Sequence, residues 1–216
     1  MILDIERIRA ARPAEAPFRW ASIAESFVSR DVARELRDTF PGGVYERFVR
    51  PTGEKRHDLR GKNLRGKFAS GSDEALAPRW QELVLDIASA EYRAALEAAS
   101  GVALEGLDIA ITAWAQRSGG FLDPHTDNPG KVLAHLFYFN DASWSSEDGG
   151  CLRILRSRSI DDVDTEVLPH LGRSVFFVRS ERSWHGYLPV RADRERLALQ
   201  VIFHYPSMEY SKGNDA

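Results

Sequence analysis

The chain has 216 residues, 43% of them hydrophobic and 28% charged, and its formal net charge is −3. This length suits one large domain or two small ones, and the nearly balanced charge argues against nucleic acid or an anionic membrane as a partner. A single cysteine, Cys151, excludes an internal disulfide and favours a reducing compartment. No apolar run is long enough to cross a membrane, and the first 20 residues lack the apolar core of a signal peptide. We therefore expect a cytoplasmic protein without nucleic-acid or membrane partners.

Helical patterns are confined to the N-terminal half of the chain. Ser29 or Asp31 can cap a first helix there. Apolar residues spaced by three and four over residues 73–100 predict two further helices, broken near Ser89, and Gly101 is placed to end the second. Because such short helices cannot enclose a core of their own, we expect them to pack against a sheet.

A long polar segment separates the first helix from the later two. Residues 44–49 predict a strand, and residues 51–72 after it are charged and punctuated by glycine. This pattern favours a solvated surface loop, which could also contact a substrate. His57 lies within that segment.

The C-terminal half has the pattern of a β protein. Short apolar runs alternate there with turns rich in Gly, Pro, Asn and Asp. The predicted strands cover residues 107–114, 131–140, 149–155, 165–168, 174–178, 186–190 and 197–205. Strands that follow helices predict an α+β, mainly β, sandwich or barrel. We expect one domain over residues 1–216, with a helical support at about 20–105 and a strand-rich core at about 106–206.

The first candidate site residues are His125 and Asp127, in the stretch Leu122–Pro129. Residues two apart in an extended chain point to the same face, so this pair can reach one point from a single strand end. An imidazole nitrogen and a carboxylate oxygen at one point suit a divalent transition metal.

A third ligand is needed, and His185 is the best placed candidate. It follows an apolar strand and a polar turn and opens the run WHGYLP. Two histidines and one carboxylate form a facial triad, which leaves adjacent metal positions open for a chelating cosubstrate and O₂. Zinc is the competing metal: one cysteine argues against a structural zinc site, and a hydrolytic site would need a general base that no HExxH spacing supplies.

Two arginines open the last apolar strand. In Arg194 to Gln200, strict alternation would place both Arg194 and Arg196 on one face. An arginine there forms a salt bridge at the rim or a bidentate clamp for the carboxylate of a cosubstrate. Parity alone does not separate the two arginines.

Several ordered motifs together resemble one known family, the iron(II) and 2-oxoglutarate-dependent oxygenases, and within it the prolyl 4-hydroxylase-like branch. The motifs are HTDNP (125–129), LFYFN (136–140), Trp144 before GGCLRI (149–154), GRSVFFVRSERSWH (172–185) and an arginine before an alternating apolar strand (196–203). The resemblance covers about Ile109 to Tyr205 and implies a double-stranded β-helix, or jelly-roll, with supporting N-terminal helices.

The resemblance also implies roles for individual residues. His125, Asp127 and His185 match the iron ligands. Arg196 matches the basic residue that pairs with the distal carboxylate of 2-oxoglutarate, and Tyr138 matches a tyrosine whose hydroxyl supports that carboxylate. The family's usual tyrosine is missing from the strand before HTDNP, where Trp114 or Gln116 would have to replace it.

The implied activity is hydroxylation. Such enzymes use iron(II), O₂ and 2-oxoglutarate, release succinate and CO₂, and some also use ascorbate. An intact carboxylate at Asp127 favours hydroxylation or another oxidation over halogenation. The expected substrate is a prolyl residue of a peptide or protein, or a small amino-acid-like molecule. A non-catalytic binding module of the same fold and a zinc hydrolase are the alternatives, and no motif in the candidate substrate loops, 54–72 and 142–148, names a substrate.

Overall fold

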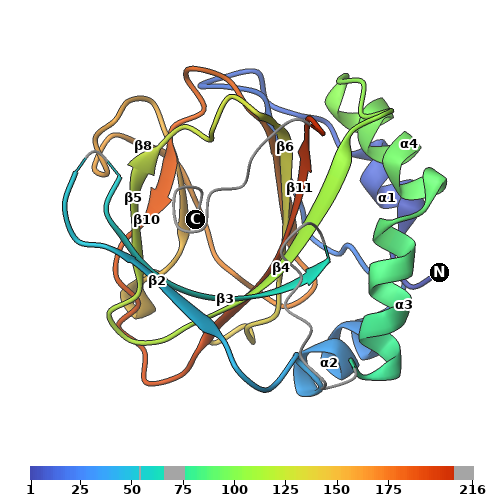
Figure 1. Ribbon diagram of the computed structural model, residues 1–216, viewed down its shortest axis with the longest axis horizontal. Helices are drawn as coiled ribbons and strands as arrows, with labels where there is room; N and C mark the ends of the chain where they lie inside the picture. The colour runs from blue at the N-terminus through green and yellow to red at the C-terminus, as the bar shows by residue number, and fades with distance from the viewer. Residues whose placement is uncertain (54, 66–75, 207–216) are drawn as a thin grey trace.

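The computed structural model describes residues 1–53, 55–65 and 76–206, which form one eleven-stranded sheet with helices packed on one of its faces (Figure 1). The helices are α1 (Ile5–Ala10), α2 (Arg30–Asp38), α3 (Pro78–Ile87), α4 (Ala90–Ser100) and the 3₁₀-helix η1 (Ser146–Asp148). The strands are β1 (Trp20–Ile23), β2 (Glu46–Arg50), β3 (His57–Arg65), β4 (Asp108–Gln116), β5 (Phe121–His125), β6 (Lys131–Tyr138), β7 (Leu152–Leu155), β8 (Val163–Val167), β9 (Ser174–Val178), β10 (His185–Tyr187) and β11 (Arg196–His204).

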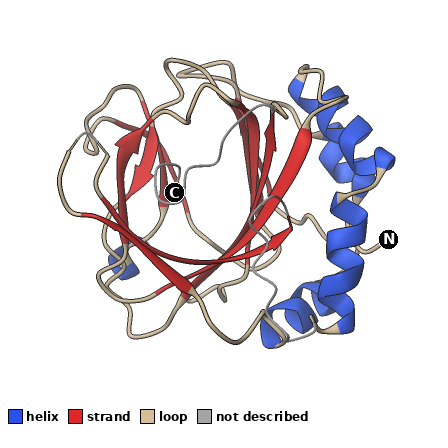
Figure 2. Cartoon of the chain, in the orientation of Figure 1, coloured by secondary structure: helices blue, strands red, loops and turns tan. Residues whose placement is uncertain are grey.

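The sheet curls so that two walls of antiparallel strands face each other (Figure 2). One wall has the order β1-β9-β6-β11-β4, and the other has the order β5-β10-β7-β8. Strand β3 joins them, because its residues Gly61 to Arg65 pair with β4 and its first two residues pair with β5. This arrangement is a jelly-roll, and it confirms the predicted mainly β fold.

Alternation along the strands divides the apolar residues between two cores. On β11, Leu199, Val201 and Phe203 belong to the core shared with the helices, whereas Ala198 and Ile202 belong to the core between the two walls. The same alternation turns Arg196 and Gln200 toward the space between the walls. The polar residues of β11 therefore face the interior of the jelly-roll, where a site can form.

The α-helices α1 to α4 cover the outer face of the first wall, on the right in Figure 1. Trp80 and Leu83 of α3 and Tyr92 and Leu96 of α4 are fully buried against it. The predicted break near Ser89 and the end at Gly101 are both confirmed, and Ser29 is the residue that caps α2. Within the described residues, none of the helices combines the length and the apolar composition that crossing a bilayer would require.

The predicted surface loop at 51–72 is wrong for residues 57–65, which form β3 at the junction of the two walls. The interior-facing positions of β3 are His57, Leu59 and Gly61, so the strand shows no run of apolar side chains that could have revealed it. Strand β1 adds a further strand to the segment 20–105 that we expected to be a helical support. Residue 54 and residues 66–72 of the predicted loop lie outside the described part of the chain.

A buried chain of hydrogen bonds connects the helices to the sheet through His135. The Tyr92 hydroxyl lies 2.9 Å from His135 Nδ1, and His135 Nε2 lies 2.8 Å from the Ser174 hydroxyl, which bonds in turn to Ser26. All four side chains are fully buried. Burial lowers the pKa of His135 to about 3, so this ring stays neutral in the folded protein.

We expect acid to destabilise the fold through His135. An unfolded histidine binds a proton below pH 6.5 and the folded one only near pH 3, so the free energy of unfolding should fall as the pH drops between these values. The loss is about 1.4 kcal/mol per pH unit for each such histidine. Urea unfolding of wild type and His135→Gln between pH 7 and pH 4 measures it. In His135→Gln, the free energy of unfolding should depend less steeply on pH. An equal pH dependence in both proteins would contradict a neutral, buried His135.

Candidate metal centre

Strand pairing brings His125, Asp127 and His185 together between the two walls. His125 is the last residue of β5 and is the register partner of His185, the first residue of β10. Asp127 follows β5 by two residues. One potential ligand atom from each of the three side chains lies within 4.8 Å of the other two, and all three residues are buried. Because a metal ligand set needs convergence from separate segments, this pairing explains how residues 60 positions apart meet.

Hydrogen bonds to the backbone fix the orientation of both histidine rings. His125 Nδ1 lies 3.0 Å from the carbonyl oxygen of Asp123, and His185 Nδ1 lies 2.8 Å from that of Ser183. A carbonyl only accepts, so each Nδ1 carries the proton and donates it. Each Nε2 then presents a lone pair, and His125 Nε2 lies 3.9 Å from Asp127 Oδ1. This is how proteins orient metal-binding histidines.

The electrostatics keep these three groups in the forms that bind metals. Burial is the main cause that lowers the pKa of His125 and of His185, so both rings are neutral at pH 7. Burial alone would raise the pKa of Asp127, but the positive charge of Lys131 and the two histidines outweigh it and hold that pKa below its ordinary value. Two neutral imidazoles and one carboxylate are a donor set that suits iron(II).

Sequence reasoning missed one member of this cluster, Lys131. Its ammonium lies 2.9 Å from Asp127 Oδ1, and both side chains are almost fully buried. Arg179 supports the same residue through a 3.0 Å hydrogen bond to the backbone oxygen of Asp127. The sequence gives a weak signal for Lys131, a charged residue that begins the apolar strand four positions after Asp127.

The three residues line a narrow cavity inside the jelly-roll. Its other lining residues are Leu59, Trp114, Leu122, Lys131, Leu136, Leu152, Phe177, Tyr187, Arg196 and Gln200. Most of this lining is apolar, and the volume is about 50 Å³, enough for a few water molecules. The histidines and the carboxylate therefore converge in a small, mostly apolar space.

Arg196 lies in the wall of this cavity and is 2% exposed. Its guanidinium carbon lies 4.7 Å from the centre of the Tyr187 ring and 5.3 Å from that of Tyr138, and its Nε donates to the backbone oxygen of Gly150. The buried Tyr138 hydroxyl has no hydrogen-bond partner among the described residues. Burial raises the pKa of Tyr138 to about 12, so the hydroxyl remains a donor.

The structure distinguishes the other predicted site residues by their distance from the cavity: only Trp114 lines it, and Arg194 and Gln116 do not. Arg194 precedes β11 and forms ion pairs with Asp141 and Asp148. Of the two roles left open by the sequence, it therefore has the salt bridge at the rim and not the position of a carboxylate clamp. Gln116 accepts a hydrogen bond from the Arg60 backbone at 2.8 Å and is not among the residues that line the cavity. Trp114 does line it.

With this geometry in place, the comparison with protein families can be set beside it. The family model of the 2OG-Fe(II) oxygenase superfamily matches residues 110–204, the segment that contains all three convergent residues. This segment, a little under half of the chain, is therefore similar to that superfamily. None of the curated proteins matches the sequence of this chain.

Solved structures share the fold of this chain. A prolyl-4-hydroxylase from Pseudomonas putida superposes with a TM-score of 0.63 at 22% identity, covering 93% of this chain and 96% of that one. A prolyl hydroxylase from Trichoplax adhaerens, in complex with a hypoxia inducible factor peptide fragment, has a TM-score of 0.63 at 16% identity and covers 94% and 87%. An oxidoreductase of the 2OG-Fe(II) oxygenase family from Burkholderia pseudomallei has a TM-score of 0.60 at 17% identity and covers 86% and 84%. At these identities the likeness shows a common fold.

A glycine makes room for Trp114 in the wall of the narrow cavity. The indole Nε1 donates to Gln200 Oε1 at 3.1 Å, and the ring lies against Gly61 of β3. A Cβ atom at position 61 would lie 2.5 Å from a carbon of that ring, closer than packed atoms approach.

We expect Gly61→Ala to displace Trp114 and to destabilise the protein by about 1–3 kcal/mol, the usual result of overpacking. Tryptophan fluorescence and thermal unfolding measure the two effects. Gly42→Ala is the matched control, because a Cβ there meets nothing within 4 Å. If both variants match the wild type in fluorescence and stability, Gly61 does not position the indole.

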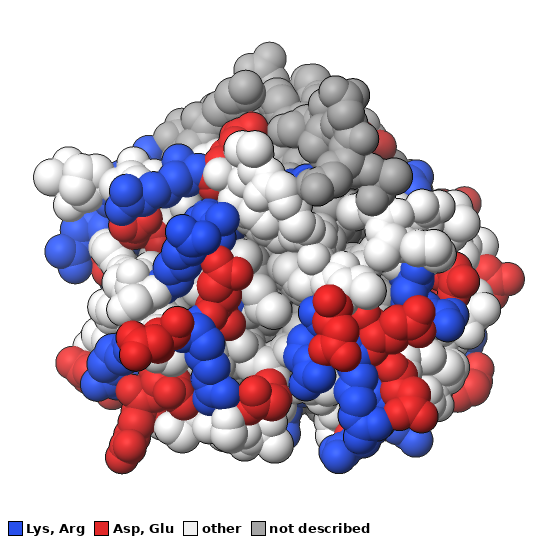
Figure 3. Space-filling model, turned by 90° about the horizontal axis from the view of Figure 1, so that it is seen from below, with Lys and Arg blue, Asp and Glu red and all other residues white. Residues whose placement is uncertain are grey.

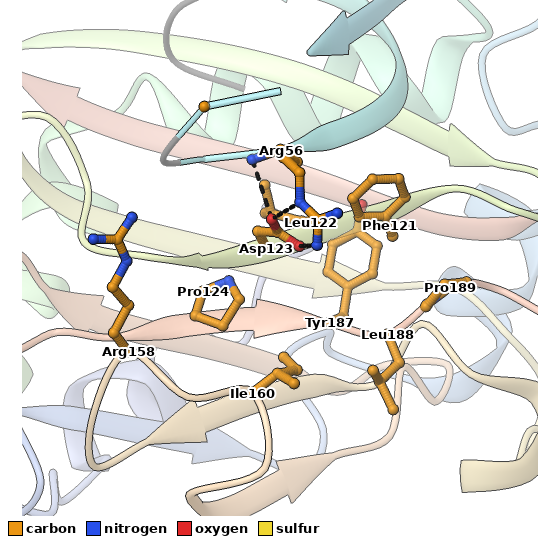
Figure 4. Close-up of a pocket in the computed structure, with 11 residues that line it drawn as sticks. Arg56, Phe121, Leu122, Asp123, Pro124, Arg158, Ile160, Tyr187, Leu188 and Pro189 are labelled. Atoms are coloured by element: carbon orange, nitrogen blue, oxygen red, sulfur yellow. Dashed lines mark hydrogen bonds and ion pairs between the residues drawn. The ribbon is translucent and has the colours of Figure 1, made fainter. Parts of the chain in front are cut away.

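A second, larger cavity has a volume of about 580 Å³ (Figure 4). Leu122 and Tyr187 line both this cavity and the narrow one that contains the triad. An ion pair between Arg56 and Asp123, 2.7 Å apart, forms one side of it. In Figure 4, Arg158 lies across the cavity from that pair. The charged residues in the space-filling view of Figure 3 are of both signs and interspersed, so the visible face carries no extended basic or acidic patch.

Proposed function

We propose that this protein is an iron(II)- and 2-oxoglutarate-dependent dioxygenase that hydroxylates a prolyl residue or a small amino-acid-like substrate. The observation that carries the proposal is the convergence of two histidine Nε2 atoms, of fixed tautomer, on the Asp127 carboxylate. The superfamily provides the reaction class, in which O₂ and 2-oxoglutarate are consumed and succinate and CO₂ are released. The partners are therefore O₂ and a peptide or small-molecule substrate.

In this proposal His125, Asp127 and His185 hold the iron. Bound iron(II) supplies the redox chemistry with O₂ that amino-acid side chains lack. The protein contributes rigid ligands, because the Asp123 and Ser183 carbonyls prevent either ring from rotating. It also contributes a mostly apolar environment, since Leu136, Phe177 and other apolar residues line the cavity beside the triad.

Arg196 and Tyr138 are the residues that we assign to the distal carboxylate of 2-oxoglutarate. A guanidinium binds a carboxylate with two parallel hydrogen bonds, and Arg196 is already oriented by Tyr187 and the Gly150 carbonyl. The unpartnered Tyr138 hydroxyl needs an acceptor to offset the cost of its burial. A carboxylate between these two groups would satisfy both.

Succinate formation tests the proposal. Purified protein supplied with iron(II), O₂, 2-oxoglutarate and ascorbate should release succinate slowly without substrate, and faster when a substrate is present. Metal analysis after anaerobic purification belongs to the same experiment. Bound zinc with no gain from iron would favour a hydrolase, and failure to bind iron or 2-oxoglutarate would favour a non-catalytic module.

A further inference from the structure

A third cavity lies between α2 and three loops of the sheet. Its volume is about 340 Å³, which is in the range of small-molecule sites. The loops follow β1, follow β6 and precede β9, and they contribute Glu25, Asp141 and Arg173 to the lining. Among the described residues, none lines both this cavity and the narrow one that contains the triad. A ligand bound here would therefore occupy a site of its own.

Arg173 contributes a positive charge to the lining of this cavity. Among the residues that the structure describes, none pairs with its guanidinium, and its buried Nε has no hydrogen-bond partner. Its backbone is fixed on both sides, because the N–H donates to the His170 oxygen at 3.0 Å and the oxygen accepts from the Tyr138 N–H at 2.9 Å. A buried donor that is left unpaired costs free energy, and an anion in the cavity would remove that cost.

Three more arginines reach the cavity from α2. Arg30, Arg34 and Arg37 are spaced by four and three residues, so they share one face of the helix. Glu25 pairs with Arg30 at 2.8 Å within the lining. Arg34 and Arg37 pair with aspartates of the helix itself, at 2.5 Å and 2.8 Å, and these aspartates do not line the cavity. Because exposed ion pairs of this kind are weak, an anion in the cavity could bind both arginines at little cost.

We propose that this cavity binds a phosphate group, free or carried by a small molecule, between Arg173 on one side and Arg34 and Arg37 on the other. A phosphate monoester carries a charge of about −1.5 to −2 at pH 7 and offers three acceptor oxygens, so each of three guanidinium groups can address one oxygen. A carboxylate offers only two oxygens and one charge. The lining also includes Ala142 and Leu171, which leave an apolar surface for the remainder of a phosphorylated molecule.

Calorimetry of the full chain with inorganic phosphate, glycerol 3-phosphate, glycerol and malonate tests this proposal. At least one phosphate probe should bind about tenfold or more tightly than glycerol, which lacks the charge, and than malonate, which carries its charge on two carboxylates. Tighter binding of glycerol 3-phosphate than of inorganic phosphate would identify a small phosphorylated molecule as the ligand. The reverse order would identify free phosphate.

Arg173→Met should weaken binding of the preferred phosphate probe by about tenfold or more, because charge-assisted hydrogen bonds are lost. Glu25→Gln should instead tighten it by up to about fivefold, because Arg30 is released from its ion pair and can act on the phosphate. Damage to the fold would not produce a gain of affinity. Arg156→Met is the matched control, since this exposed arginine pairs with Asp164 and does not line the cavity.

Arg196→Ala distinguishes this site from the narrow cavity, where a phosphate could also meet an arginine. It should bind the phosphate probe as the wild type does. The proposal would be overturned if neither phosphate probe bound better than malonate and glycerol, if Arg173→Met bound like the wild type, or if Arg196→Ala lost the binding instead. Circular dichroism shows which variants are folded. If Arg173→Met is not folded, Glu25→Gln decides, since unchanged or weaker binding in it would contradict the site.

Discussion

His125→Ala will abolish iron-dependent conversion of 2-oxoglutarate and weaken metal binding by more than about 100-fold. Mutating a residue that only orients a metal ligand already costs up to about 100-fold in metal affinity, and losing a ligand should cost more. The variant leaves two of the three convergent side chains, and two ligands hold a divalent ion poorly. The apolar environment of the cavity is retained, so the loss is specific to the Nε2 lone pair. Calorimetry with manganese(II) and a succinate assay measure the two effects.

His170→Ala is the matched control for this variant. His170 is a half-buried histidine that contacts the Trp144 carbonyl and does not line the cavity. It should leave metal affinity within about twofold of the wild type, as surface substitutions do. Equal losses in both variants would point to a general effect on folding, and normal metal affinity in His125→Ala would remove the triad as the metal centre.

Arg196→Ala will raise the KM for 2-oxoglutarate by about 100-fold or more, because truncating one partner of a buried, hydrogen-bonded charge pair costs about 2–5 kcal/mol. Arg196→Lys keeps the charge but not the bidentate geometry, and it should lose about tenfold. The metal affinity of both variants should stay close to that of the wild type, since Arg196 contacts Tyr138, Tyr187 and the Gly150 carbonyl rather than the triad.

Arg194 provides an unusually close control, two residues away in the same chain. It is paired with Asp141 and Asp148 at the rim, and surface ion pairs of this kind contribute about 0–1 kcal/mol. Arg194→Ala should therefore leave the KM for 2-oxoglutarate unchanged. If the two alanine variants exchanged these phenotypes, the clamp would be Arg194, and our assignment of Arg196 would be wrong.

The sequence predicted the convergence of the triad because each member has a local signal. His125 and Asp127 are two residues apart at a strand end, and His185 follows an apolar strand and a turn. The helices α2 to α4 could also be predicted, since the serine caps of α2 and α4 and the apolar spacing of α3 and α4 are local signals. These features depend on short stretches of chain, which a single sequence describes well.

The missed features depend on contacts between distant segments. Strand β3 alternates polar side chains with buried residues at His57, Leu59 and Gly61, so its pairing with β2, β4 and β5, not an apolar run, identifies it as a strand. Arg194 and Arg196 have the same parity and differ because the chain becomes regular only at Arg196. The burial of Lys131 likewise follows from its ion pair with Asp127, which no pattern of residue types reveals.

Calorimetric titration of the wild type with 2-oxoglutarate, with and without manganese(II), tests the metal centre most directly. We expect binding of one equivalent of 2-oxoglutarate that tightens by about tenfold or more when the metal is present, since an open metal face and Arg196 would then act on the same molecule. Arg196→Ala should weaken this binding, and His125→Ala should remove its dependence on metal. Binding of 2-oxoglutarate that does not change with the metal, or no binding at all, would contradict the proposed function.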